Sequence, residues 1–326
     1  MTEAIKRKKP FRKKYKNEIK AFLLIGLPLL WWGVFFVFAL VRAIYFSFTD
    51  LTFDVNANLS FSLESYRRIF AFGTEYFDSL FWRSLGISLI WTGVMLVANN
   101  FMGMLVAWML TTIKSHRARR MILGFLFWPS LISAVASAHI ISMVFSSGSS
   151  GLFNRIVMLF GGYPQDWLGN PNTALIALMV VPFLLGFSGR MIIYYAAMLG
   201  VPETYYEAAK FDTSSKVRPF FHITLPLIKN AIVLNLVLSL IEGVRILAPM
   251  QLVDGVADET MSVVLYIFNL AFYPQALGSE GLVDGRRLNQ FGRASAYAMI
   301  VFVVILVLTL IQFKLTGKEA ENVSAG

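Results

Sequence analysis

The chain lacks cysteine altogether and contains only three histidines among its 326 residues. Without cysteine, neither a disulfide framework nor a cysteine-ligated zinc or iron–sulfur site can form. The histidines, His116, His139 and His222, are too widely scattered to match the spacing of a metal site. We therefore expect no metal site in this protein.

Charged residues are also scarce, at 15% of the sequence, whereas hydrophobic residues make up 57% and the mean hydropathy is +0.64. Soluble domains carry about a quarter charged residues, so this balance indicates a polytopic membrane protein. A membrane helix needs about 20 apolar residues, and residues 21–313 contain enough such stretches for a six-span, all-α domain. The predicted spans are Ala21–Val41, Ser84–Leu110, Met121–Phe145, Thr173–Leu199, Leu227–Met250 and Ala294–Phe313.

The sequence also lacks a phosphate-binding loop of the pattern G-x-x-x-x-G-K-[S/T]. Its Gly317-Lys318 pair is followed by Glu319 and lies in a tail that no predicted strand precedes. We therefore expect no ATP site of this kind and no catalytic residues in this chain. An ATP-driven process would require a separate ATPase chain.

Basic residues are concentrated at the start of the chain and in alternate loops. Residues 1–20 carry nine Lys or Arg, and the proposed inner segments together carry nineteen, against seven in the outer loops. Positive charge is retained on the cytoplasmic side of membranes, so both termini, including the tail 314–326, are predicted to be cytoplasmic. The charge run alone would fit a nucleic-acid arm, but the apolar run that follows favours an anchor to membrane lipid and no nucleic acid partner.

Polar and helix-breaking residues occur inside several of the predicted spans. The paired amides Asn99-Asn100 should face protein and form interhelical hydrogen bonds. Trp128-Pro129 predicts a kink in the third span, because proline frees a backbone carbonyl. The fourth span is expected to be interrupted at Pro182, Gly186 and Gly189.

A polar segment of 27 residues, Gly200–Pro226, separates two of the predicted spans. Pro202 suits the first turn of a helix, which we expect to run to about Phe211. The Asp212–Ser215 cluster offers side-chain oxygens to free backbone amides, which favours a turn and the N-cap of a second helix. Leu225-Pro226 is expected to end that helix, because proline removes a hydrogen-bond donor. The segment therefore predicts a cytoplasmic helix–turn–helix on the membrane surface.

This segment resembles the EAA signature of bacterial ABC-importer permeases, which runs E-A-A, then D-G, then I-x-L-P. The corresponding positions here are Glu207-Ala208-Ala209, Asp212 and Ile223-Thr224-Leu225-Pro226, whereas Thr213 stands where the family usually has glycine. The resemblance implies that the segment is the coupling helix that docks in a cleft of an ATP-hydrolysing subunit. It assigns this contact to Glu207, Ala208, Ala209, Asp212, Thr213, Leu225 and Pro226.

The resemblance covers most of the chain and is closest in overall pattern to the carbohydrate-uptake branch of these importers. It implies a permease subunit of the bacterial inner membrane that forms half of the transmembrane pathway for a carbohydrate. It further implies two ATPase subunits that bind ATP–Mg, a second permease subunit and an extracytoplasmic solute-binding protein. No cofactor is expected in this chain itself.

Charged residues inside membrane spans are costly and usually face a wet cavity or a partner. Arg190 has no carboxylate three or four positions away, so it needs an acid such as Glu242, a backbone carbonyl, water or the solute. Glu242 and Arg245 lie three positions apart and could instead neutralise each other. These three charges, with Tyr194 as a ring that could stack on a sugar, form the candidate solute path.

Two other classes of membrane protein fit parts of the sequence. The stretch Gly186–Gly189 matches the G-x-S-G nucleophile pattern of an intramembrane serine protease, with Ser188 as nucleophile and His139 as its base. The only histidine after Ser188 is His222 in the cytoplasmic loop, and close helix packing also explains the small residues. A secondary transporter would fit a polytopic chain, but no internal repeat or dense series of membrane carboxylates is present.

Thr213 allows a test of the turn geometry. A β-branched residue is strained at positive φ, so a turn of that kind predicts that Thr213→Gly raises stability by up to about 1 kcal/mol. A right-handed turn capped by Asp212 or Ser214, which we favour, predicts a loss instead, because glycine has more conformational freedom in the unfolded chain. The sign of the change in melting temperature of the purified protein distinguishes the two turns.

Overall fold

The computed structural model describes residues 22, 24–51, 60–74, 77–212, 215, 217–253, 260–283 and 286–324. Within these residues the chain is built almost entirely of helices. The only strands in the described part are β1 (Leu282–Val283) and β2 (Arg286–Arg287), which pair as a short antiparallel hairpin. The predicted all-α fold is confirmed.

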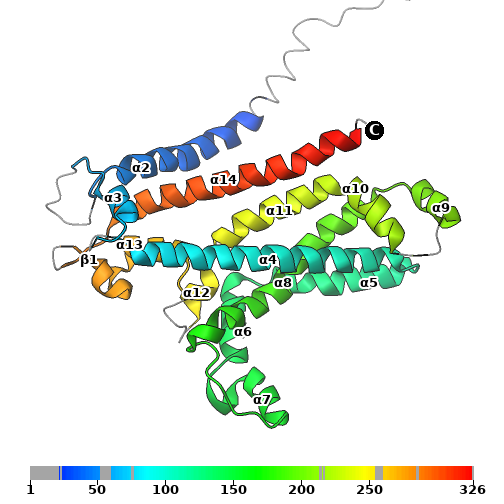
Figure 1. The fold of residues 1–326 in the computed structure, drawn as a ribbon, viewed down its shortest axis with the longest axis horizontal. Coiled ribbons are helices and arrows are strands. Elements are labelled where there is room, and N and C mark those ends of the chain that lie inside the picture. The colour runs from blue at the N-terminus through cyan, green and yellow to red at the C-terminus, as the bar shows by residue number, and fades with distance from the viewer. Residues whose placement is uncertain are drawn as a thin grey trace, which may run out of the picture.

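Long apolar helices form the body of the molecule (Figure 1). Five of those described are long and apolar enough to cross a membrane, and a sixth span results if one bent helix pair is counted as a single span. The first runs over Leu24–Ser47 and includes the π-helical η1 (Gly33–Val37) and α2 (Phe38–Ser47). The others are α4 (Ser79–Thr112), α8 (Pro171–Leu199), α11 (Lys229–Val244) with α12 (Ala248–Leu252), and α14 (Phe291–Ser324).

Shorter helices lie at the two ends of these spans (Figure 1). One end carries α3 (Glu64–Phe70), α13 (Val263–Phe272) and η6 (Pro274–Gly281), whereas η3 (Gly148–Ser150) and α7 (Leu152–Leu159) follow α6, and α7 lies below the bundle in Figure 1. The opposite end carries α9 (Glu203–Asp212), η4 (Phe220–Thr224) and α10 (Leu225–Leu227). The start of the first helix and the C-terminal end of α14 lie at the same end as α9.

The predicted third span, Met121–Phe145, is not one straight helix. Its two halves are α5 (His116–Phe127) and α6 (Ala134–Val144), which are joined through η2 (Trp128–Leu131) and bent by 90°. The kink expected at Trp128-Pro129 is therefore a break. Proline lacks an amide donor, and the helix restarts only where the Ser133 hydroxyl accepts from the Ala136 amide at 3.2 Å.

The expectation that the fourth span is interrupted is wrong. The fourth span is continuous, because α8 runs through Pro182 without a break and neighbouring helices can compensate for the donor that proline lacks. The fifth predicted span, Leu227–Met250, corresponds to the candidate span Lys229–Leu252, within which α11 ends at Val244 before α12 begins. At this point Gly243 packs so closely on Thr92 that a Cβ atom would lie 2.8 Å from the threonine side chain.

The second and sixth spans are longer than predicted. The range Ser84–Leu110 lies inside α4, and Ala294–Phe313 lies inside α14, because both helices continue through polar residues at their ends. The predicted C-terminal tail 314–326 is helical as far as Ser324.

Glycine allows α4 and α8 to approach closely. A Cβ atom on Gly103 would lie 2.9 Å from the Cβ of Arg190, so only glycine fits this contact without a shift. Toward the α9 end, buried Ala107, Met191 and Met198 continue the same interface. This packing holds α8 against α4 and thereby positions the charge that α8 carries.

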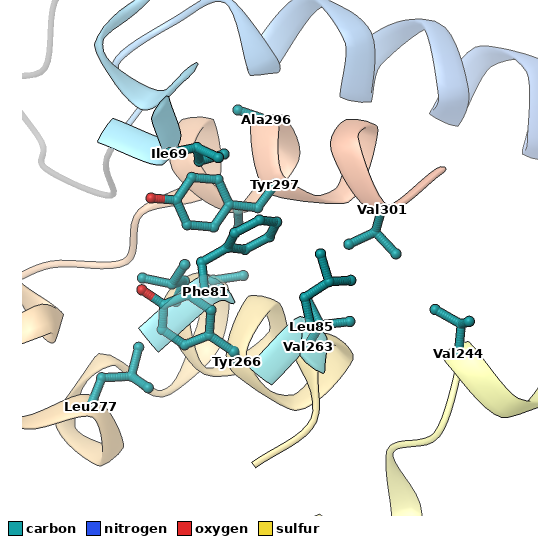
Figure 2. Close-up of a cluster of buried hydrophobic side chains, with 13 residues drawn as sticks. Ile69, Phe81, Leu85, Val244, Val263, Tyr266, Leu277, Ala296, Tyr297 and Val301 are labelled. Atoms are coloured by element: carbon teal, nitrogen blue, oxygen red, sulfur yellow. The ribbon is translucent and has the colours of Figure 1, made fainter. Parts of the chain in front are cut away.

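A polar network is buried beside the hydrophobic cluster at the α3 end. Figure 2 shows Phe81, Tyr266 and Tyr297 packed together, with both tyrosine hydroxyls on one side of the cluster. The Asp78 carboxylate accepts from the Phe81 amide at 3.0 Å, the Tyr266 hydroxyl at 2.7 Å and the Tyr297 hydroxyl at 2.5 Å. It also forms an ion pair with Arg293, whose side chain is 8% exposed. One carboxylate therefore joins α4, α13 and α14.

The environment of Asp78, which precedes the membrane span, sets its ionisation. Burial by itself raises the pKa of this carboxyl, but the Arg293 guanidinium and the tyrosine hydroxyls outweigh burial and hold the pKa below its ordinary value. A carboxyl whose pKa is lowered in the folded state stabilises the fold at neutral pH. This contribution is lost as the pH falls through the folded-state pKa.

We expect Asp78→Asn to destabilise the protein by about 3–5 kcal/mol at pH 7, because it leaves the buried Arg293 charge unpaired. The melting temperature of the purified protein measures the loss. The difference from wild type should begin to narrow below about pH 4, where the unfolded chain takes up a proton that the native carboxyl does not yet bind, and should vanish only below the lowered pKa of the folded state. Asp50→Asn is the control, since Asp50 is exposed and only accepts from the Ser60 hydroxyl at 3.2 Å. Equal melting temperatures for wild type and Asp78→Asn at pH 7 would contradict the network.

Candidate functional site

The helix of the predicted coupling segment is α9, at one end of the molecule (Figure 1). Gly200 caps α8 with an ordinary right-handed backbone at φ −77°, and α9 starts at Glu203. Glu207 and Ala208 are exposed, whereas Ala209 is partly buried and lines a cavity beneath the helix. The EAA residues therefore lie on two different faces of α9.

A polar contact holds α9 against the segment that follows it. The hydroxyls of Tyr206 and Thr224 are 2.8 Å apart, and Thr224 is only 3% exposed. The Ser215 hydroxyl accepts from the amides of Val217 and Arg218, both at 3.3 Å. This cap lies within the predicted Asp212–Ser215 cluster and precedes the second helical segment, as expected.

The predicted helix end at Leu225-Pro226 is wrong. The π-helical η4 continues directly into α10, which contains both residues, and the chain first leaves helical geometry at Ile228. The Leu225 amide donates to the Phe220 carbonyl five residues back, and this wider turn makes room for the proline ring. The side chain of Asp212 and all of Thr213 lie outside the described residues, so the turn geometry there stays a prediction.

The outward surface at this end exposes aromatic side chains together with charges of both signs, which include Lys210 and Arg218. Phe211 is 93% exposed, Phe221 57% and Tyr205 50%. Glu203 and Glu207 are exposed on the same short helix. Exposed aromatic side chains gathered in this way indicate an interaction surface, because a monomer in water gains nothing from them. The surface suits a hydrophobic cleft in another protein.

Arg190 and Glu242 form an ion pair between α8 and α11. Arg190 is 8% exposed, whereas the Glu242 side chain is 68% exposed. Arg245 directly follows α11, is exposed, and forms no ion pair within the described residues. Glu242 therefore pairs with Arg190 on the neighbouring helix. Within the described residues, Arg245 does not neutralise it.

Tyr194 is fully buried and lines neither of the cavities beside these charges. Its hydroxyl donates to Asn100 Oδ1 at 2.7 Å, and Asn100 Nδ2 donates to Ser239 Oγ at 2.9 Å. Asn100 thus joins α8 and α11 to α4, as expected for an amide inside the membrane. The expectation that the Tyr194 ring stacks on a sugar is not met in this structure, because helix packing covers the ring.

Two cavities adjoin Glu242. One, of about 180 Å³, is also lined by Asn99 and Arg190, and the other, of about 580 Å³, is lined by Arg245. They share Pro182, Gly186, Glu242 and Ile246, so they are neighbouring parts of one space. This space, between α8 and α11, offers a carboxylate and a guanidinium to a polar solute.

Asn99 is a cavity residue that the sequence did not reveal. Contrary to expectation it makes no interhelical hydrogen bond within the described residues: Nδ2 donates to Met95 Sδ at 3.8 Å, and the buried Oδ1 has no partner. One position along a helix is a rotation of about 100°, so Asn99 cannot share the face that Asn100 presents to α8 and α11. Only the neighbouring helices decide which of the two amides is paired.

The geometry does not support an intramembrane protease. Ser188 is fully buried, and its hydroxyl donates to the Leu185 carbonyl at 3.0 Å. His139 is exposed on α6, and no hydrogen bond joins it to Ser188 in the described part of the chain. The described residues also include no group of three or more His, Asp or Glu placed to hold a metal ion.

Membrane-length helices with an exposed helix at one end and a polar space between two spans define a polytopic membrane protein. The family described as binding-protein-dependent transport system inner membrane component matches residues 99–317, and the chain belongs to this family. The predicted importer family is thereby confirmed.

Characterised relatives match nearly the whole chain. The arabinooligosaccharides transport system permease protein AraP of Bacillus subtilis (strain 168) is 27% identical over 308 residues, which cover 93% of this chain and 90% of AraP. The multiple sugar-binding transport system permease protein MsmF of Streptococcus mutans is 23% identical over 309 residues, or 94% of this chain and 98% of MsmF.

Solved structures share the fold. A chain of a bacterial ABC transporter involved in the import of the acidic polysaccharide alginate superposes with a TM-score of 0.74 at 19% identity, over 95% of this chain and 99% of that chain. The same kind of transporter in complex with an alginate pentasaccharide-bound periplasmic protein gives a TM-score of 0.72 at 20% identity. The six-span permease architecture is therefore that of known ABC importers.

We expect Glu242→Gln to destabilise the protein by about 1–3 kcal/mol, because it removes the counter-charge of the buried Arg190 guanidinium. Arg190→Met should cost less, since the exposed Glu242 can be solvated by water. The double variant Arg190→Met/Glu242→Gln should therefore melt at a higher temperature than Glu242→Gln alone. Arg245→Met is the control and should leave the melting temperature unchanged. Equal losses for Glu242→Gln and the double variant would contradict the ion pair.

Proposed function

We propose that this chain is the permease subunit of an ABC importer for a carbohydrate and that it forms half of the transmembrane pathway. The observation that carries the proposal is the exposed EAA helix α9 at the end of a bundle of spans, in a member of the binding-protein-dependent transport family. Similarity to arabinooligosaccharide and multiple-sugar permeases over more than nine-tenths of the chain supports a carbohydrate as the solute.

The connections of α9 explain how movement of an ATPase reaches the solute path. On one side, only residues 200–202 separate α9 from α8, which carries Arg190. On the other, the Tyr206–Thr224 contact links α9 to η4, which continues through α10 toward α11 and Glu242. A displacement of α9 therefore acts on both helices that hold the ion pair, and can change the space between them as the helices shift.

The space beside the ion pair suits hydroxyl-rich solutes. The exposed Glu242 carboxylate accepts hydrogen bonds from sugar hydroxyls, and the Arg245 guanidinium donates to their oxygens. Pro182 and Gly186 of α8 line both cavities and have no long side chain, so a sugar ring could pass beside α8 there. Few polar contacts in a hydrated cavity give modest affinity, which suits a path that must release its solute.

Partner subunits complete the proposed transporter. Two ATPase subunits bind ATP–Mg, a second permease supplies the other half of the pathway, and an extracytoplasmic solute-binding protein delivers the carbohydrate. The α9 end faces the cytoplasm of a bacterial inner membrane, because the basic loops lie at that end. The start of the first helix and the end of α14 lie at the same end (Figure 1), which supports cytoplasmic placement of both termini.

We expect Ala208→Trp to block docking of the ATPase, because Ala208 is exposed on α9 where the two proteins would approach closely. ATPase co-purification and ATP-dependent uptake from a panel of labelled oligosaccharides should fall together, by about tenfold for a loss of about 1.4 kcal/mol at the interface. The melting temperature of the permease should change little, since no buried residue is replaced.

Two matched variants separate docking from folding. Ala209→Trp introduces the same side chain on the cavity face of α9 and should lower thermal stability. Ala276→Trp introduces it at an exposed position of η6, at the opposite end, and should affect neither stability nor ATPase co-purification. Full ATPase co-purification and uptake by Ala208→Trp would overturn the proposed role of α9.

A further inference from the structure

A cavity of about 870 Å³ lies between α9 and the membrane helices beneath it. Its walls come from the ends of α4 and α8, from Arg119 on α5, from α9 itself and from η4. It is separate from the space beside Glu242, because the two sets of lining residues have no member in common. The solute path proposed above does not use this cavity, whereas Tyr206, Ala209 and Thr224 of the coupling segment line its wall.

The lining of this cavity is amphipathic. Trp108, Met198 and Phe220 form an apolar wall, in which the Trp108 and Phe220 rings lie 5.0 Å apart. Arg119 and Lys210 supply two positive charges, against the single negative charge of the exposed Glu203. An occupant must therefore combine an anionic group with an apolar portion.

Two hydrogen bonds hold the Arg119 side chain in place, but one of its donors has no acceptor among the described residues. Its Nη2 donates to the Ile113 carbonyl at 2.9 Å and its Nη1 to the Tyr195 hydroxyl at 3.4 Å. Its Nε is buried and has no hydrogen-bond partner among the residues that the structure describes. Lys210 makes no hydrogen bond or ion pair within the described residues. An anion between these two side chains would satisfy donors that are otherwise left without an acceptor.

We propose that this cavity binds an anionic phospholipid, with the phosphate beside Arg119 and Lys210 and the first part of an acyl chain along the Trp108–Phe220 wall. Basic pockets between membrane helices on the cytoplasmic side are suited to phospholipid headgroups. Free phosphate would satisfy the same donors, but it would leave the apolar wall exposed to water. The proposal rests on the cytoplasmic orientation of α9 and not on the identity of the transported solute.

The position of the lipid gives it a role in coupling. The bound lipid would fill the space under Ala209, on a different face of α9 from the exposed Ala208. A filled space resists compression when an ATPase pushes on α9, so the displacement is passed to α8 and η4. We therefore expect anionic lipid to favour coupled transport. Neutral lipid should stabilise the fold less than anionic lipid does.

The test compares retained lipid by native mass spectrometry after reconstitution of the complete transporter with phosphatidylglycerol or with phosphatidylcholine. Wild type should retain phosphatidylglycerol through detergent extraction. Arg119→Gln and Lys210→Gln should each reduce the retained fraction by about tenfold, as expected for loss of one charge-assisted hydrogen bond. Arg117→Gln on the same helix, exposed and outside the cavity lining, is the matched control and should retain lipid as wild type does.

Further arms make each outcome decisive. Arg119→Lys keeps the charge and should retain more lipid than Arg119→Gln even if both melt at lower temperature than wild type. Equal retention of phosphatidylglycerol by wild type and Arg119→Gln/Lys210→Gln overturns the proposal. Equal retention of phosphatidylglycerol and phosphatidylcholine by wild type also overturns it. Thermal stabilisation by inorganic phosphate equal to that by phosphatidylglycerol would assign the site to a free anion and reject the lipid. Loss of uptake with unchanged lipid retention would count against the proposed transport function. It would leave the lipid site supported.

Discussion

A guanidinium buried inside a membrane protein needs a counter-charge, and the pairing of Arg190 with Glu242 organises the centre of this molecule. Gly103 lets the backbone of α8 approach α4 at the point where the Arg190 side chain begins. The side chain then reaches across to α11, and Asn100 joins the same three helices through Tyr194 and Ser239. The spacing of α8 and α11, and with it the size of the space beside Glu242, depends on these contacts.

The two ends of the molecule are stabilised in different ways. At the α3 end, one fully buried carboxylate, Asp78, joins α4, α13 and α14 and leaves little freedom between them. At the α9 end, the Tyr206–Thr224 contact and a cavity replace such a network. This difference suits a protein that receives a mechanical displacement at α9, because a buried network of several hydrogen bonds resists relative motion more than the single Tyr206–Thr224 contact does.

Much of the fold followed from local properties of the chain. The apolar runs predicted the membrane helices, and the Asp212–Ser215 cluster predicted a cap that the structure contains at Ser215. The wrong predictions about helix breaks concern proline. Pro182 lies inside a continuous helix and Pro226 follows a π-turn, whereas Pro129 breaks a span. The same residue type gives different results because neighbouring helices determine whether the freed carbonyls find other partners.

The sequence by itself determined the class of this protein, since hydropathy, the distribution of basic residues and the EAA spacing are all local along the chain. It also marked Arg190, Glu242 and Arg245 as unusual, because charge in an apolar run is visible without a structure. Only the tertiary structure decided that Glu242 pairs with Arg190, that Tyr194 is covered, and that Ala208 is exposed while Ala209 is partly buried. Pairing and burial are set by side chains from helices far apart in sequence, and no local pattern records which of them meet.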